Sequence, residues 1–291
     1  MAQIALVTDS SATLPPALIA QYGIHVIPLY IHFGTEVFCD GLDMTPGEFV
    51  ERLQQAPALP TTSQPSVGDF LKLYRELMPR ADAIISIHLS SGLSGTVASA
   101  LGALQTLTDE AAEKGEAPPA IHVVDSAVVS VGLELLLTAA ARAIEAGETV
   151  EDVLRLVEKL MAQVRVVFVV DTLEYLHKGG RIGGASALLG SVLQVKPILH
   201  LTEGRIDVLE KVRTARKAKQ RLLAIMEECV GQECSVHAAI THVSAPDESE
   251  RLREQLAGTF TCQELFVSEL SPAVSVHVGP GTVGVAFYCE Q

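Results

Sequence analysis

The fold is decided by residues 84–107, IISIHLSSGLSGTVASALGALQTL. The isoleucines at the start of this stretch predict a buried strand, and its apolar residues after position 96 recur at the spacing of one helical face. The serines and glycines between them predict a turn at a helix start, where unpaired backbone N–H groups favour an anion. A helix that caps itself with Ser94 is the simpler interpretation of the same turn.

The order of strands and helices predicts the architecture around this stretch. Up to residue 163, short apolar strands alternate with helices, which is the pattern of a doubly wound α/β domain with a parallel sheet. Residues 164–291 contain more strands than helices, so we expect a second, α+β domain with a mixed sheet. The local predictions include a single strand at 24–33, a loop at 57–66, a small-residue helix at 185–193 and a hairpin of 197–201 with 206–212.

Composition limits the classes of protein to which the chain belongs. It has 291 residues, 48% of them hydrophobic, and a net charge of −14 from 21 basic and 35 acidic side chains. An acidic surface repels phosphates, so no nucleic-acid partner is expected. The first residues predict a strand and not a signal peptide, no apolar run is long enough to span a bilayer, and five cysteines without a C-x-x-C pair favour reduced thiols. These features predict a cytoplasmic protein.

Motifs for catalysis, metals and nucleotides are weak. The sequence around Ser94 resembles a G-x-S-x-G nucleophile elbow but has Thr96 in place of the last glycine, which leaves a lipid or ester hydrolase using Ser94 as an alternative. The GGRIGG of residues 179–184 has neither dinucleotide nor phosphate-loop spacing, and the nine histidines are scattered singly. We therefore expect no metal, no cofactor and no catalytic residue.

One basic segment interrupts the acidic chain. Six cations fall within the eleven residues 211–221: Lys211, Arg213, Arg216, Lys217, Lys219 and Arg221. Charge runs of this kind are often only a solvated helix face. Alternatively, a local positive field steers association with an acidic partner or with an anionic membrane surface.

Six fragments, in order along nearly the whole chain, resemble one known family. They are TDSSATLP (8–15), TSQPS (62–66), LSGT (93–96), DTLEYLHKGGRI (171–182), VKPIL (195–199) and GPGTVGV (279–285). Together they resemble the DegV family of bacterial fatty-acid-binding proteins. The resemblance implies two α/β domains that hold one long-chain fatty acid between them, and a protein that in many bacteria is the non-catalytic subunit presenting this acid to a separate fatty acid kinase.

The resemblance also implies roles for individual residues. The fatty-acid carboxylate would be bound by Thr62, by Ser94 and by the backbone N–H of Gly95, with His277 and Arg181 as supporting polar groups. ATP would come from the kinase, since this chain has no nucleotide motif. In this interpretation Arg213, Arg216 and Lys217 dock the kinase, and a transient contact with a membrane surface is a second possible use of the same cations.

Overall fold

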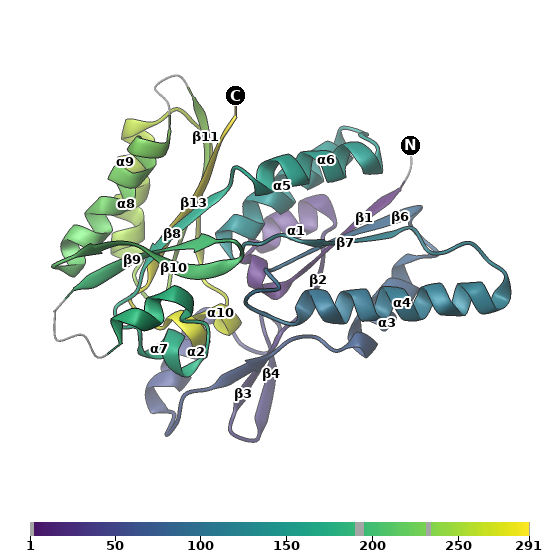
Figure 1. Ribbon diagram of the computed structural model, residues 1–291, viewed down its shortest axis with the longest axis horizontal. Coiled ribbons are helices and arrows are strands. Elements are labelled where there is room, and N and C mark those ends of the chain that lie inside the picture. Colours follow the sequence, from purple (N-terminus) through teal and green to yellow (C-terminus); the bar gives the residue numbers. More distant parts are fainter. Residues whose placement is uncertain (1–2, 190–194, 231–233, 291) are drawn as a thin grey trace.

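The computed structural model describes residues 3–189, 195–230 and 234–290. Two large sheets lie side by side, with a small third sheet below them in the view of Figure 1. The mixed α/β architecture predicted from the sequence is confirmed. Within the described ranges, no helix combines the length and the apolar character that crossing a membrane requires.

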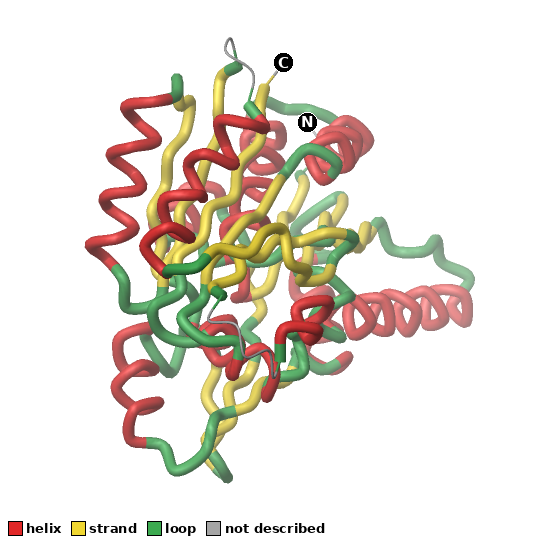
Figure 2. Tube along the Cα trace, turned by 60° about the vertical axis from the view of Figure 1, so that its left-hand side comes forward, coloured by secondary structure: helices red, strands yellow, loops and turns green. Residues whose placement is uncertain are grey.

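The first large sheet is parallel and has helices on both faces. Its order is β2 (His25–Ile27), β1 (Ile4–Asp9), β6 (Ala83–His88) and β7 (Ile121–Asp125). One face packs against α3 (Val67–Leu77) and α4 (Thr96–Lys114), and the other against α1 (Pro16–Tyr22) and α5 (Val131–Glu145), with α6 (Val150–Met161) on α5. The long α4 extends away from the rest of the molecule (Figure 2). This arrangement is the doubly wound sheet that the sequence predicts.

The second large sheet is mixed. Its order is β10 (Arg205–Val212), β9 (Lys196–Thr202), β8 (Arg165–Val169), β13 (Val283–Glu290), β11 (Ser235–His242) and β12 (Cys262–Glu269), with β11 and β12 parallel and the other pairs antiparallel. One face is covered by α8 (Ala215–Cys229) and α9 (Pro246–Thr259). Near the opposite face lie α5, α7 (Glu174–Lys178), α10 (Pro272–Val278) and the 3-10 helix Gly183–Leu188. The predicted hairpin is the β9–β10 pair.

The small sheet corrects two predictions. The strand expected at 24–33 is divided at Pro28, which cannot donate a ladder hydrogen bond, so β2 joins the parallel sheet while β3 (Tyr30–Phe33) joins another. β3 pairs with β4 (Glu36–Cys39) and with β5 (Thr61–Ser63), and α2 (Pro46–Gln55) follows β4. The predicted loop at 57–66 therefore contains a strand, which fixes the position of Thr62 opposite Ile31.

Two other expectations are settled only in part. The predicted helix at 185–193 is a 3-10 helix over Gly183–Leu188, and its positions 190–193 lie outside the described residues. The 3-10 helix η1 (Ser10–Ala12) follows β1 directly. The domain boundary after residue 163 stays a prediction, because one hydrophobic cluster contains residues from both sides of it.

Helix α5 joins the two large sheets. Its leucines pack in a cluster with Leu6 and Ile85 of the parallel sheet and with Ala239 and Ala286 of the mixed sheet. At Gly132 the helix approaches the mixed sheet so closely that a Cβ atom would lie 2.7 Å from Val166 Cγ2. Apolar burial on two sides therefore fixes the spacing of the sheets.

Glu134 is an ionisable residue in the largely apolar helix α5. Its side chain is fully buried, Oε2 accepts a long hydrogen bond of 3.4 Å from Ser268 Oγ, and Oε1 has no partner among the described residues. Burial raises the pKa of Glu134 to about 8. The side chain is therefore neutral in the folded protein at neutral pH.

We predict that Glu134→Gln stabilises the protein at alkaline pH. Because the pKa of Glu134 is raised, its contribution to stability is present below its ordinary pKa of 4.5 and is lost as the pH rises through about 8. The free energy of unfolding of the variant should match the parent near pH 4 and exceed it at pH 9, by on the order of 4 kcal/mol. Denaturant unfolding across this pH range measures the difference. Glu145→Gln, on the exposed face of α5, is the matched control, and an equal gain at all pH values would contradict the prediction.

Candidate functional site

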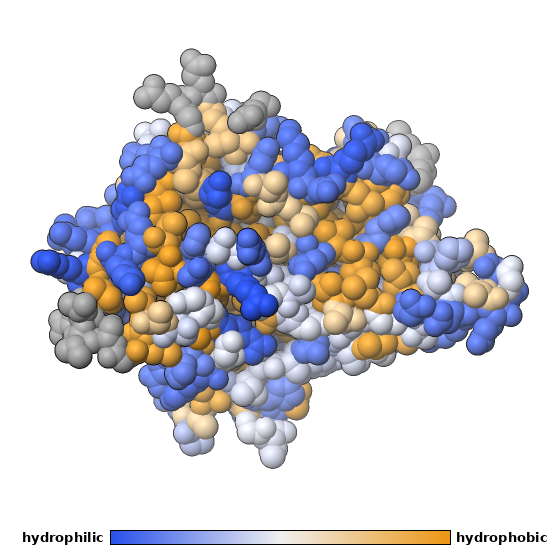
Figure 3. Space-filling model, viewed as in Figure 1, coloured by the Kyte–Doolittle hydropathy of each residue, from blue (hydrophilic) through white to orange (hydrophobic). Residues whose placement is uncertain are grey.

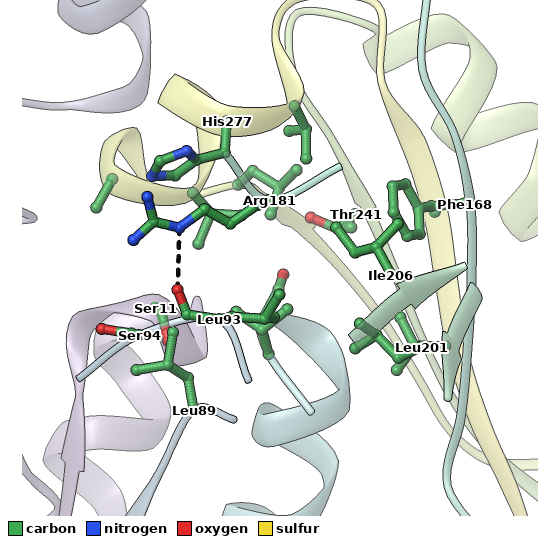
Figure 4. A pocket seen from close by; sticks show the side chains of 18 of the residues that line it. Ser11, Leu89, Leu93, Ser94, Phe168, Arg181, Leu201, Ile206, Thr241 and His277 are labelled. Atoms are coloured by element: carbon green, nitrogen blue, oxygen red, sulfur yellow. Dashed lines mark hydrogen bonds between the residues drawn. The ribbon is translucent and has the colours of Figure 1, made fainter. Parts of the chain in front are cut away.

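A cavity of about 930 Å³, its open mouth included, lies between the two large sheets. The mixed sheet, the small sheet, α5, α7, α10 and the segments that follow β1, β2 and β6 of the parallel sheet contribute to its wall, which Figure 4 shows from close by. Most of the wall is apolar: Leu29, Leu89, Leu93, Val129, Val131, Val166, Phe168, Leu176, Leu201, Ile206, Leu270, Ala273, Val274, Val278 and Val285.

Four of the five residues predicted to hold a carboxylate line this one cavity. Thr62 comes from β5, Ser94 from the turn before α4, Arg181 from the loop after α7, and His277 from α10. In Figure 4, Arg181 and His277 lie on one side and Ser94 on the other. These elements are far apart in sequence, so the fold gathers the polar residues at one place.

Gly95, the fifth predicted residue, does not line the cavity and is the N-cap of α4. A Cβ atom at this position would lie 2.8 Å from the side-chain amide nitrogen of Gln64, so glycine leaves room for the Gln64 side chain. No side chain caps α4, and Ser94 directly precedes the cap. Its backbone N–H groups at the helix start remain suited to an anion, but the binding role of Gly95 stays a prediction.

The Thr62 hydroxyl and His277 Nε2 are 2.8 Å apart. Burial, and then the positive charge of Arg181, lower the pKa of His277 to about 4, so its ring is neutral at physiological pH. Nδ1 is buried without a partner among the described residues, and an N–H there would be unsatisfied. We therefore assign the ring proton to Nε2, which donates to Thr62 Oγ1 and leaves the Thr62 hydroxyl proton free to point into the cavity.

The Arg181 side chain extends from the loop after α7 to the turn before α4, on the other side of the cavity wall. Its Nε–H donates to the Leu93 carbonyl at 3.0 Å, the bond drawn in Figure 4, and an Nη1–H donates to the Gly179 carbonyl at 2.7 Å. A guanidinium has five N–H donors, so further donors remain for a ligand. Arg181 therefore ties the turn before α4 to the loop after α7 and places a positive charge at the polar end of the cavity.

Several other hydroxyl groups near the wall already have hydrogen-bond partners. Ser11 donates to Asp9, Thr241 to the Ser268 carbonyl and Thr282 to the Gly279 carbonyl, while Ser130 and Thr13 share a hydrogen bond of 3.1 Å. A polar group whose hydrogen bonds are satisfied does not need a ligand to accept or donate. The inner part of the cavity therefore behaves as an apolar surface.

A hydrolytic role for Ser94 lacks the necessary base. The Ser94 hydroxyl hydrogen-bonds the Thr96 hydroxyl at 2.9 Å, and none of the nine histidines, all within the described ranges, hydrogen-bonds it. A serine nucleophile requires an adjacent general base. Among the described residues, Ser94 thus has no histidine in position to act as its base.

Two further parts of the site were missed in the sequence. Gln64 lines the cavity beside Gly95, although the TSQPS fragment contains it. Beneath the cavity wall, Asp9 accepts hydrogen bonds from Ser11 and from His88 Nδ1, the latter at 3.0 Å, and His88 Nε2 lies 2.7 Å from Ser86 Oγ. This fully buried network positions Ser11 and gives His88 a structural role.

Only some of the cations in the basic segment 211–221 are free of ion pairs with acidic side chains. Lys219 pairs with Glu248 at 3.1 Å, and Arg221 pairs with Glu210 and Glu228 at 2.7 and 2.6 Å. Arg213, Arg216 and Lys217 are exposed, and the described residues place no carboxylate within 4 Å of them. We call these three residues the basic cluster. Among the described residues, no group of three or more metal-ligating side chains is suited to hold a metal ion.

Comparisons with known proteins cover almost the whole chain. The family model described as "Uncharacterised protein, DegV family" matches residues 3–290. A DegV domain-containing protein of Streptomyces coelicolor is 39% identical over 97% of each chain, and protein DegV of Bacillus subtilis is 35% identical over 98% of each.

Solved structures agree with the fold. A DegV family protein from Thermus thermophilus, described by its fatty acid binding, superimposes with a TM-score of 0.90 at 36% identity, covering 99% of this chain and 100% of that one. DegV of Bacillus subtilis, described as a fatty acid binding protein, superimposes with a TM-score of 0.89 at 34% identity over 100% of both chains.

We predict that His277 titrates far below an ordinary histidine. Its lowered pKa means that its contribution to stability is present above pH 6.5 and is lost as the pH falls through about 4. Imidazole NMR signals followed from pH 7 to 3.5 should show the neutral ring down to about pH 4. Arg181→Gln should raise this pKa, because a nearby cation is removed, but should leave it below 6.5, because burial remains. A midpoint near 6.5 in the parent protein would contradict the assignment.

Proposed function

Because the chain belongs to the DegV family, we propose that it binds one long-chain fatty acid in the cavity between its two large sheets. The observation that carries this proposal is the division of the cavity into a polar end and an apolar remainder. Thr62, Ser94, Arg181 and His277 stand at the polar end, where a single carboxylate would be bound. The fatty acid binding of the Thermus thermophilus and Bacillus subtilis relatives supports the same ligand class.

The two parts of such a ligand contribute differently to binding. Burial of one methylene is worth about 0.8 kcal/mol, so a tail of about fourteen contributes on the order of 11 kcal/mol before the costs of association. Each hydrogen bond to the charged head contributes roughly 1.5–3 kcal/mol. The tail therefore supplies most of the affinity, and the head determines the orientation of the acid.

The polar end suits an ionised carboxylate. The Thr62 hydroxyl is free to donate once His277 Nε2–H bonds its oxygen, Ser94 offers a second hydroxyl, and Arg181 offers a positive charge. Hydrogen bonds and a nearby cation favour the charged form of an acid. An ionised carboxylate is a nucleophile, whereas a protonated one is not.

We infer that the bound acid is presented to a separate fatty acid kinase. A carboxylate oxygen attacks the γ-phosphorus of ATP, the bond from this phosphorus to the β,γ-bridging oxygen breaks, and ADP leaves with the electron pair. The products are acyl phosphate and ADP, and no proton moves through this chain. The sequence offers no nucleotide-binding motif, so the kinase would supply ATP and its metal ion.

The basic cluster is the proposed contact for this kinase. Arg213 lies between β10 and α8, and Arg216 and Lys217 lie in the first turn of α8. Helix α8 is at the left of the molecule in Figure 1, and the left edge is largely hydrophilic in Figure 3. Three unpaired cations on an acidic chain form a local positive field that accelerates encounter with an acidic surface. A transient contact with anionic lipid is the other use of such a field.

Removal of either hydroxyl at the polar end should weaken fatty acid binding. Thr62→Ala and Ser94→Ala should each raise the dissociation constant of a delipidated protein about tenfold or more, because each removes a hydrogen bond to a charged group. Calorimetry with oleate measures this, and native mass spectrometry of the purified protein shows whether an acid is already bound. Ser91→Ala, at an exposed position of the same turn, is the matched control.

Two results would argue against this assignment. A delipidated parent protein that binds no long-chain acid would overturn the proposed function. Turnover of an ester substrate that disappears in Ser94→Ala would establish the hydrolase instead.

Charge reversal of the basic cluster should affect the kinase and not the lipid. The triple variant Arg213→Glu, Arg216→Glu and Lys217→Glu should keep its fatty acid content but form acyl phosphate more slowly with the kinase, most visibly at low salt, since screening over about 10 Å weakens the field at 0.1 M. Acyl phosphate formation across a salt series is the measurement. The control reverses three exposed cations on α3 and α4 or beside them, Lys72, Arg80 and Lys114. Equal rates for the parent and the triple variant would mean that the basic cluster is only a solvated helix face.

A further inference from the structure

A second groove adjoins the polar end of the fatty-acid cavity. It has a volume of about 1,070 Å³, its open side included, and is lined by residues 57–62, Tyr175, Lys178, Gly179, Arg181, Val276 and His277. Thr62, Arg181 and His277 line both spaces. These three residues therefore form a partition, with the apolar cavity on one side and the groove on the other.

The groove differs from the cavity in its charge. Lys178 and Arg181 line it, and no carboxylate does, although the chain has 35 acidic and 21 basic residues. Arg181 uses two of its five N–H donors on the Leu93 and Gly179 carbonyls, which leaves three for a ligand. Lys178 is exposed and pairs with Glu174 at 2.6 Å, a surface pair of the weak kind that an incoming dianion can displace.

The wall of the groove is well fixed on both sides. Thr61 and Thr62 belong to β5 and are held by its pairing with β3. Lys178 ends α7, and Gly179 lies directly against the His277 ring, because a Cβ atom at Gly179 would collide with Nδ1. Arg181, in the partition, and Lys178, beside it, therefore stand at defined backbone positions and not on a free loop end.

We propose that this groove is a phosphoryl subsite, in which Lys178 and Arg181 hold the phosphate of an acyl phosphate whose chain stays in the cavity. The inference rests on the proposed function, because only transfer to the bound carboxylate creates such a ligand. The transferred group adds a dianion to an oxygen at the partition, and the apolar cavity cannot accept it, since an unpaired buried charge is strongly disfavoured. The groove adjoins this point and is lined by two cations and by no carboxylate, so it can accept the dianion.

A stable analogue tests the subsite without the kinase. The probe is a long-chain 2-oxoalkylphosphonate, in which a CH₂ group replaces the bridging oxygen of acyl phosphate, and the reference ligand is the fatty acid of matching chain length. Lys178→Gln should weaken phosphonate binding about fivefold relative to the fatty acid, a modest factor because the lysine is exposed. Glu174→Gln, which releases Lys178, should strengthen phosphonate binding. Lys114→Gln, at the far end of α4, is the control and should change neither.

The outcomes separate the subsite from the function itself. A ratio of phosphonate to fatty acid affinity that stays at the parent value in Lys178→Gln would overturn the subsite while fatty acid binding stands. If inorganic phosphate binds the groove as tightly as the phosphonate does, the groove is a site for a free anion. This result would also overturn the proposal. A parent protein that binds neither lipid would overturn the proposed function, and the subsite with it.

Discussion

The position of α5 between the two large sheets determines where a ligand has room. Its leucines fill the space between the sheets, and Gly132 brings the helix into contact with Val166. The helix begins at Val131, and residues 129–131 form part of the cavity wall. The cavity therefore lies at the N-terminal end of α5, beyond the stretch of the helix that packs between the sheets.

Polar contacts around the cavity also join segments that are far apart in the sequence. Arg181 bonds the Leu93 carbonyl, Ser90 Oγ donates to the Gly204 carbonyl at 2.7 Å, and Asp40 accepts from the Ala273 N–H at 3.2 Å. Each of these bonds joins segments more than eighty residues apart. A hydrogen bond contributes about 1 kcal/mol net, far less than the burial of several leucines along α5. These contacts therefore contribute less to holding the two halves of the molecule together than the leucines of α5 do.

Local patterns in the sequence predict the elements but not their assembly. The strand, turn and helix of residues 84–107 are confirmed as β6 and α4, since each follows from residue spacing within a few turns. The division at Pro28 and the strand β5 were missed, because three-residue strands are defined by their partner and not by their own periodicity. Thr62, Ser94, Arg181 and His277 came from the resemblance, and only the fold shows that they share one cavity. Lys178 lies in the DTLEYLHKGGRI fragment, but no pattern in the sequence places it near Thr61, since that proximity depends on a contact across more than one hundred residues.

The two groups of cations differ in what salt does to them. The basic cluster is in water on the face of the mixed sheet covered by α8, whereas the cavity lies at the opposite face, as the alternation of Val167 and Phe168 along β8 shows. A field that acts through water weakens beyond about 10 Å at 0.1 M salt, so the cluster can influence only the encounter with a partner. Arg181 is tied to two carbonyl groups at the polar end of the cavity, where a contact at hydrogen-bond distance is screened far less. In the proposed function, charge at the cluster would therefore set how fast the kinase arrives, and charge at the partition would set what can remain bound after the kinase leaves.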